Sequence, residues 1–298
     1  MSSSIPQGSY PIREFARCTG VNPATLRAWE RRYGLIHPFR SEQGHRFFSE
    51  EHVRHVRRIL YWLEQGYPIR QISLLLLGHH EHIEGHGSAG NPDHWQQQQQ
   101  GVIDSLMALD LKRLDALWCK AFSTYPIALY YQHCLAPLRQ QLRAGSKLDD
   151  PMLLHTMEYL LQRKLNCLFY QQQRRASSPT LLMATNHPSG ELDVLVRACA
   201  IGAVGLRVEY LGPNLTPNDL CLAASVLEAR QIWIHFIATT TDQQTRWQRY
   251  LSHTERSNII TGTPPNHEGG RPNMQRLRTP LPRQIQHYVL NTGRATNA

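Results

Sequence analysis

Hydrophobic positions change their spacing along the chain, and each spacing predicts a different kind of structure. Up to residue 77 they recur every three or four residues in short runs, which is typical of several short amphipathic helices. Residues 78–94 lack this periodicity, are rich in glycine and histidine, and are interpreted as a linker. From 95 to 176 the helical spacing returns in four longer segments, which predicts a helical bundle. The chain is therefore expected to be multidomain, with a third domain at 177–298.

Residues 177–298 alternate between short apolar runs and amphipathic segments. Such alternation predicts parallel strands joined by helices that cover both faces of a doubly wound, flavodoxin-like α/β sheet. A crevice for a ligand or partner is expected at the carboxyl ends of the strands. Strands are expected at 179–185, 206–212, 231–238, 257–263 and 274–279, with helices at 191–203, 217–229, 242–252 and 282–290.

The most informative stretch begins with a short helix that is marked at both ends. Asn22 is a good N-cap, Pro23 suits the first helical position, and Gly34 can take the left-handed conformation that ends a helix. One face of this helix is apolar and the other is small and basic. A small basic face suits the major groove of DNA, where arginine binds guanine edges or phosphates and threonine approaches base edges. The inward face holds Leu26, Trp29 and Tyr33, and the outward face is expected to hold Ala24, Thr25, Arg27, Ala28 and Arg31.

A β-hairpin is predicted directly after this helix. Residues 36–40 and 46–48 have the composition of two short strands, and the Ser-Glu-Gln-Gly sequence at 41–44 suits the turn between them. Arg40 and Arg46 then flank the hairpin tip, where two arginines suit contacts with the DNA backbone. We count the neighbouring His45 among the expected DNA contacts.

The stretch from Thr25 to Arg46 resembles the winged helix-turn-helix of the MerR family of bacterial transcription regulators. The signature of that family is Thr-Leu-Arg, an aromatic residue, a charged pair, Gly-Leu, a proline, an arginine and Gly-x-Arg. This chain supplies, in order, Thr25, Leu26, Arg27, Trp29, Gly34, Leu35, Pro38, Arg40, Gly44 and Arg46. The resemblance implies a homodimer or higher oligomer that binds double-stranded promoter DNA and acts on RNA polymerase indirectly, as an activator or a repressor. The implied DNA contacts are Thr25, Arg27, Arg31, Arg40, His45 and Arg46.

The C-terminal half resembles the cobalamin-binding-type module that follows the DNA-binding domain in one branch of this family. The sequences Glu-Leu-Asp-Val at 191–194 and Tyr-Leu-Gly-Pro-Asn-Leu-Thr at 210–216 support this resemblance. In relatives that bind cobalamin, a Glu-x-His-x-x-Gly loop supplies a histidine ligand and leaves room for the nucleotide tail. Here Asp193 stands at the histidine position and Val196 at the glycine position. A carboxylate is a poorer cobalt ligand than imidazole, and valine occupies the space that the tail needs.

Other positions also depart from the cobalamin-binding pattern. A small hydroxyl residue is replaced by His235, and a Gly-Gly pair is reduced to Gly262. In the bundle, the tryptophan and the Glu-His pair that cap the cofactor in relatives correspond to Leu142 and to a pair that keeps only His155, which we interpret as a packing histidine. We therefore expect no cofactor, and a degenerate module that docks a signalling protein or holds a different small molecule. The alternative is a cobalamin-dependent light or cofactor sensor in which His187 is a substitute ligand.

Composition indicates an anionic partner for the N-terminal region. The formal net charge is +9, and residues 1–77 hold eleven arginines and six glutamates, so about a quarter of the length contributes more than half of the positive excess. The six cysteines lie far apart without a Cys-x-x-Cys pair, and we interpret them as buried thiols of a reducing compartment. No signal peptide or long apolar run is present. The sequence therefore predicts a cytoplasmic protein without membrane contact.

Two other classes of function match the sequence less well. An enzyme is not expected, because no catalytic domain, no nucleophile with a paired base and no carboxylate pair is recognisable. A pure interaction adaptor with a vestigial DNA module conflicts with the intact stretch described above. The linker contains histidines that could gather a divalent metal, but no cysteine or caging helix lies near them, so we expect a solvated tether and no metal site. These histidines are His79, His80, His82 and His86.

Overall fold

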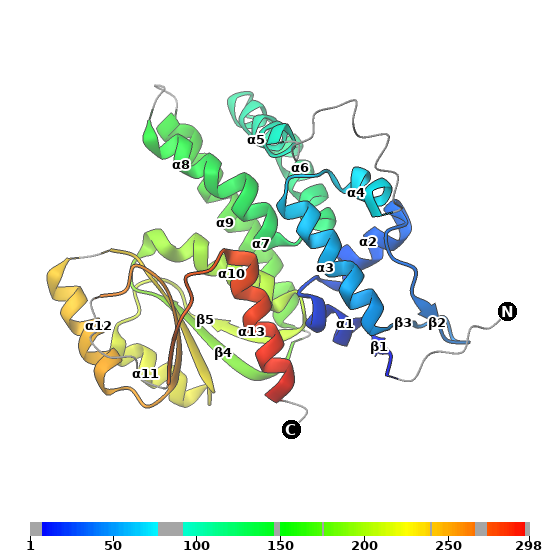
Figure 1. Cartoon of the computed structure of the whole chain (residues 1–298). Helices are drawn as coiled ribbons and strands as arrows, with labels where there is room; N and C mark the ends of the chain where they lie inside the picture. The colour runs from blue at the N-terminus through cyan, green and yellow to red at the C-terminus, as the bar shows by residue number, and fades with distance from the viewer. Residues whose placement is uncertain are drawn as a thin grey trace. The chain divides into compact units, whose positions relative to one another are not determined.

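A computed structural model of the chain describes residues 8–76, 92–145, 150–174, 176–238, 240–265 and 273–295. By packing, the chain divides into two compact units, Met1–Tyr159 with Gln286–Ala298, and Leu160–Ile285. The first unit holds the N-terminal module and most of the helical bundle, and the second holds a parallel sheet (Figure 1). Among the described residues, no helix is both long enough and apolar enough to cross a membrane.

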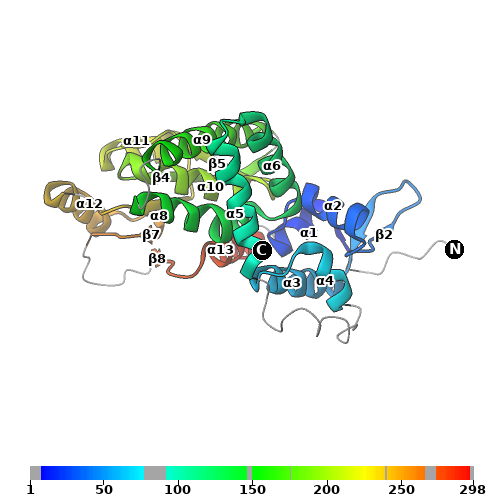
Figure 2. The ribbon, with the colours of Figure 1, turned by 90° about the horizontal axis from the view of Figure 1, so that it is seen from above.

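The N-terminal module is a winged helix-turn-helix. A small antiparallel sheet of order β1-β3-β2 forms the wing and ties it to the N-terminus. The strand β1 was not expected from the sequence, and β2 is shorter than predicted because Leu35 and Ile36 are buried in the preceding loop. In Figure 2 the hairpin projects from the helices of this module. Its elements are β1 (Tyr10–Pro11), α1 (Ile12–Thr19), α2 (Pro23–Tyr33), β2 (Phe39–Arg40), β3 (Arg46–Phe48), α3 (Glu50–Glu64) and α4 (Ile69–Leu76).

The helical bundle follows the sequence prediction with two differences. The first helix begins at Pro92, inside the segment predicted as a linker, and residues 78–91 with their four histidines lie outside the described residues. The third predicted helix contains one π-helical turn, η2. The elements are α5 (Pro92–Met107), α6 (Leu111–Thr124), α7 (Ile127–Tyr130), η2 (Tyr131–Leu135), α8 (Ala136–Ala144) and α9 (Asp150–Gln173).

The second unit confirms the predicted doubly wound, flavodoxin-like sheet. Five parallel strands lie in the order β5-β4-β6-β7-β8, which places the topological switch point between β4 and β6. The elements are β4 (Ser177–Thr185), η3 (Pro188–Gly190), α10 (Glu191–Gly202), β5 (Leu206–Tyr210), α11 (Pro217–Val226), β6 (Gln231–Phe236), α12 (Thr241–His253), β7 (Ser257–Gly262), β8 (Met274–Arg276) and α13 (Leu281–Ala295).

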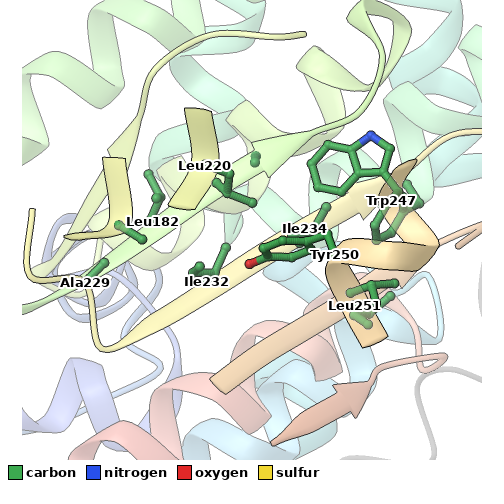
Figure 3. Close-up of a cluster of buried hydrophobic side chains, with 12 residues drawn as sticks. Leu182, Leu220, Ala229, Ile232, Ile234, Trp247, Tyr250 and Leu251 are labelled. Atoms are coloured by element: carbon green, nitrogen blue, oxygen red, sulfur yellow. The ribbon is translucent and has the colours of Figure 1, made fainter. Parts of the chain in front are cut away.

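Helices cover both faces of this sheet. On one face, a buried cluster joins the strands to Leu220 of α11 and to Trp247 and Tyr250 of α12 (Figure 3). Leu182 of β4 belongs to that cluster, so its neighbours in the strand point to the opposite face, where α10 contacts β4 and β5. The sheet is therefore buried on both sides, and its strand ends are the places where side chains can meet a ligand or a partner.

The cysteines differ from the prediction. They were expected to be buried, but Cys119, Cys167 and Cys221 are exposed, and Cys134 and Cys199 are buried. Each exposed cysteine lies beside an apolar helical stripe and not within it, a difference of one helical position that the sequence pattern does not resolve. Within the described residues, no three His, Cys, Asp or Glu side chains gather to hold a metal ion.

Candidate DNA-binding surface

The helix α2 is fixed at its start by a side-chain cap. The Asn22 side chain accepts a hydrogen bond from the Thr25 backbone N–H at 2.8 Å and donates to the Thr25 hydroxyl at 2.9 Å. The prediction that Thr25 faces outward is wrong, since its side chain is fully buried. Thr25 lies one helical turn before Trp29, so it shares the buried stripe of that residue. Its role in the structure is to hold the start of α2.

Two of the predicted DNA contacts lie on the open face of α2. Arg27 and Arg31 are exposed, and they are four residues apart, so both project from the same side of the helix. Leu26 and Trp29 occupy the buried side. The helix thus offers a basic face to the outside and an apolar face to the core, the arrangement needed for insertion into a major groove.

The wing arginines have a partner inside the protein. Arg40 on β2 and Arg46 on β3 are directly opposite each other in the ladder. Both bind Glu30 of α2: Arg40 Nη2 lies 2.5 Å from Glu30 Oε1, and Arg46 Nε lies 2.6 Å from Glu30 Oε2. The sequence predicted that these arginines face DNA and gave no role to Glu30. His45, also predicted to contact DNA, is exposed beside them.

The loop between α2 and the wing is held by α3. The ring of His55 donates from Nε2 to the Leu35 carbonyl at 2.7 Å, and the ring of His52 donates from Nε2 to the His37 carbonyl at 2.9 Å. The Nδ1 atom of His52 accepts from the Ser49 backbone N–H, which is consistent with the neutral tautomer protonated at Nε2. Two imidazoles therefore satisfy backbone carbonyls that the loop leaves open.

The buried side of α2 is anchored to the bundle. The indole N–H of Trp29 donates to the backbone carbonyl of Thr124 at 2.8 Å. Thr124 is the last residue of α6, where carbonyls lack partners within the helix. The next residue, Tyr125, binds the His94 ring at 3.0 Å, and burial raises the pKa of the Tyr125 hydroxyl. The helix α2 is therefore attached to an aromatic cluster of the bundle while Arg27 stays exposed.

The switch point of the second unit is bridged by a side chain. Asn186, directly after β4, donates from Nδ2 to the Ile237 carbonyl at 2.9 Å and accepts from the Ile237 N–H at 2.8 Å. Ile237 directly follows β6, so the two hydrogen bonds join the ends of the two strands on either side of the switch point. Nearby, a Cβ on Gly190 would lie 2.4 Å from the Thr185 hydroxyl, which leaves no free space there.

The residues compared with a cobalamin site lie in and around α10 and at the end of β6. Asp193 and Val196 lie within α10, and Val196 is 1% exposed, so its side chain is packed in the protein. The acidic residues Glu191 and Asp193 occupy the first turn of α10, where they disfavour a phosphate group. His235 is 8% exposed, and its Nδ1 lies 3.1 Å from the Thr261 hydroxyl. These residues do not match the group that the resemblance implies.

Four further positions compared with the cobalamin site have ordinary structural surroundings. The ring of His187 makes two contacts with Ser189. Its Nδ1 lies 2.7 Å from the Ser189 hydroxyl oxygen, and it accepts a hydrogen bond from the Ser189 backbone N–H at an N···N distance of 3.2 Å. Gly262 has φ +78, and a Cβ there would lie 2.0 Å from the Phe236 carbonyl oxygen, so the glycine is required by the backbone. His155 is exposed, which makes its interpretation as a packing histidine wrong, and Leu142 is buried.

Comparison with known proteins identifies the family. The family model described as MerR HTH family regulatory protein matches residues 10–78. The chain is 33% identical to the HTH-type transcriptional regulator MlrA of Salmonella typhimurium over 208 residues, which cover 70% of this chain and 81% of that protein. It is 31% identical to MlrA of Escherichia coli over 243 residues, 80% of this chain and 94% of that protein. This chain belongs to the MerR family of transcription regulators.

Other similarities of this MerR-family regulator are more distant. The HTH-type transcriptional repressor CarH of Myxococcus xanthus is 22% identical over 244 residues, which cover 79% of this chain and 81% of that protein. The solved structure of the monomethylamine corrinoid protein of Methanosarcina barkeri shares 12% identity at a TM-score of 0.45, over 66% of this chain and 99% of that protein. At that score the two structures are only loosely alike, and the doubly wound fold of this regulator is established by its own strand order.

Membership in the MerR family confirms the predicted class of function. This MerR-family regulator binds DNA through its winged helix-turn-helix and acts on transcription. Both MlrA proteins are named transcriptional regulators.

Proposed function

We propose that α2 enters the major groove of promoter DNA and that Arg27 and Arg31 make the decisive contacts with bases and phosphates. The supporting observation is that both arginines are exposed on the side of α2 opposite the buried Trp29. The wing, with the exposed His45 and the partly exposed Arg40, lies against the adjacent backbone. Thr25 is buried and is therefore not among the proposed contacts.

Two copies of the chain occupy one operator in this proposal. A two-fold symmetric operator presents two half-sites, and each half-site takes one α2 helix. Bending or untwisting the duplex between the half-sites changes how RNA polymerase meets the promoter, so the polymerase is affected indirectly. Such a regulator acts where bacterial DNA is found, in the cytoplasm.

Binding of labelled duplexes over a salt series tests the role of α2. Arg27→Ala or Arg31→Ala should weaken binding to a selected operator by about 1 to 3 kcal/mol for each lost base contact, with a smaller effect on random duplexes. Arg163→Ala on α9 is the matched control, because it removes one exposed arginine outside the winged module. Equal affinity of the wild type and both α2 variants for the operator would refute this assignment.

We infer that the α/β unit is a sensory module that does not hold cobalamin. The support comes from Val196, whose side chain on α10 is buried, and from Asn186, which bridges the strand ends at the switch point. Val196 occupies space that a nucleotide tail needs, and no imidazole stands at the position of Asp193. The unit then receives its signal from a docking protein or from a different small molecule.

Absorbance spectroscopy separates this proposal from a cobalamin-dependent light sensor. The purified protein should be colourless, and added adenosylcobalamin or methylcobalamin should change neither its melting temperature nor its DNA affinity. A stoichiometric cobalamin spectrum that disappears in His187→Ala would establish the sensor instead, with His187 as the substitute ligand. The same titration with Asn186→Ala shows whether the bridge at the switch point is what excludes the cofactor.

A further inference from the structure

Glu30 is the one acidic residue of α2, a helix that also carries Arg27, Arg31 and Arg32. A carboxylate on a surface that binds phosphates opposes binding, because it repels the DNA backbone. Its side chain is only 13% exposed, so it is turned into the module and not toward solvent. The Glu30 carboxylate therefore faces other residues of the module and not the DNA.

The carboxylate contacts both strands of the wing. One oxygen binds Arg40 on β2 and the other binds Arg46 on β3, at 2.5 and 2.6 Å. These are charge-assisted hydrogen bonds, which are shorter and stronger than those between neutral groups. Arg46 is 22% exposed and Arg40 is 50% exposed, so the Arg46 contact is the better shielded from solvent and salt.

The wing needs such an anchor because its ladder is short. β2 and β3 share only the residue pairs Phe39 with Phe47 and Arg40 with Arg46. A hairpin of this length is not stable alone, and its direction relative to α2 must be set by side chains. Phe39 packs edge-on against His52 of α3 at 5.4 Å, which holds the start of β2. Glu30 holds the next residue of β2 together with its partner across the ladder.

We infer that Glu30 is a positioning residue for DNA binding: it fixes the wing relative to α2, so that helix and wing contact one duplex together. Arg40 and Arg46 then orient the wing through Glu30 in addition to contributing positive charge. This inference rests on the proposed function of α2. It assigns to a negatively charged residue a favourable effect on binding to a polyanion.

The direction in which Glu30→Gln changes the affinity for DNA tests the inference. If charge alone matters, Glu30→Gln removes a repulsion and tightens DNA binding. If positioning matters, the same substitution weakens binding by about tenfold, because the loss of one strong hydrogen bond to the wing is worth that factor. Glu42→Gln is the matched control: Glu42 is exposed in the wing turn, and its substitution removes the same charge without touching Arg40 or Arg46.

The experiment uses the full chain and a fluorescein-labelled duplex that the wild type has selected from a random library. We expect Glu30→Gln to bind about tenfold more weakly, with a salt slope smaller by about one because wing contacts with phosphates are lost. Glu42→Gln should bind at least as tightly as the wild type. Glu30→Asp keeps the charge but cannot reach both arginines, so its affinity should lie between those of Glu30→Gln and the wild type.

A double variant tests whether Glu30 acts through Arg46. In an Arg46→Gln background, Glu30→Gln should cause no more than about a twofold additional loss, because the shielded contact is already gone and only the more exposed contact with Arg40 remains to be weakened. All variants are compared at a temperature where circular dichroism shows them folded. Specific binding by the wild type, with Glu30→Gln as tight as Glu42→Gln, overturns the inference and leaves the role of α2 intact. Failure of the wild type to select any duplex counts instead against the proposed function.

Discussion

The contact between Trp29 and α6 makes a quantitative prediction. Trp29→Phe keeps an aromatic ring in place but removes the indole N–H that donates to the Thr124 carbonyl at 2.8 Å. Trp29 is fully buried and Thr124 is 4% exposed, so water cannot easily replace the lost donor. The substitution therefore leaves a buried carbonyl without this partner and a smaller ring in a closely packed site.

The size of the effect follows from these two losses. A buried acceptor that loses its partner costs about 1 to 3 kcal/mol, and the space left by the smaller ring adds to this cost. We expect Trp29→Phe to lower the free energy of unfolding of the first unit by about 2 to 4 kcal/mol. Because the contact joins α2 to the bundle, backbone amides near the end of α6 should also exchange faster with solvent.

Chemical denaturation followed by far-UV circular dichroism measures this cost. Trp62→Phe is the control, since Trp62 is partly exposed on α3 and makes edge contacts with Tyr61 at 5.4 Å and with Tyr67 at 5.1 Å. That variant loses the same chemical group without opening a buried carbonyl, and it should cost less than about 1 kcal/mol. Equal costs for the two variants would refute the anchoring role of Trp29.

Three more predictions concern other parts of the fold. Leu109 has φ +51 and is 61% exposed, so Leu109→Gly should raise stability by about 0.5 to 1 kcal/mol in thermal unfolding, since glycine removes the left-handed strain and little burial is lost. Gly262→Ala should destabilise the second unit by more than about 2 kcal/mol in denaturant titrations, because its Cβ would meet the Phe236 carbonyl oxygen at a positive φ. Burial lowers the pKa of His94 and His133, so below their ordinary pKa of about 6.5 the unfolded chain binds protons that the native rings exclude. The free energy of unfolding should therefore be highest above about pH 6.5 and should decrease as the pH falls below it. His133→Phe should make the decrease in the free energy of unfolding between about pH 7.5 and about pH 5.5 smaller.

Local signals explain why much of the winged module could be predicted. The limits of α2 follow from Asn22, Pro23 and Gly34, which act on the backbone next to them and need no tertiary information. The alternation of strands and helices likewise determined the doubly wound sheet, because parallel strands require crossover helices. Both features depend on residues close in sequence.

Contacts between distant residues were not predictable in the same way. Glu30 meets Arg40 and Arg46 across ten and sixteen positions, and the sequence shows only an acidic residue among basic ones. Thr25 was expected outside because the predicted apolar stripe omitted the position one turn before Trp29, where the Asn22 side chain and the buried stripe enclose it. A periodicity argument assigns a face to each residue, but the partner that covers that face comes from the fold.

In the α/β unit, too, the helices were predictable from the sequence but the contacts between distant residues were not. The helix that contains Asp193 was expected from Glu191 onward, so its location in α10 follows from the sequence. The bridge from Asn186 to Ile237 spans fifty-one positions and could not be anticipated. These hydrogen bonds connect the ends of β4 and β6 at the switch point.

Selection of duplexes from a random library by the purified full chain tests the central claim, that α2 reads DNA through its exposed arginines. We predict enrichment of one sequence with two-fold symmetry for the wild type, and loss of preference at defined positions of each half-site for Arg27→Ala and Arg31→Ala. The same enriched sequence from the wild type and both variants, or no enrichment by the wild type, would contradict the account.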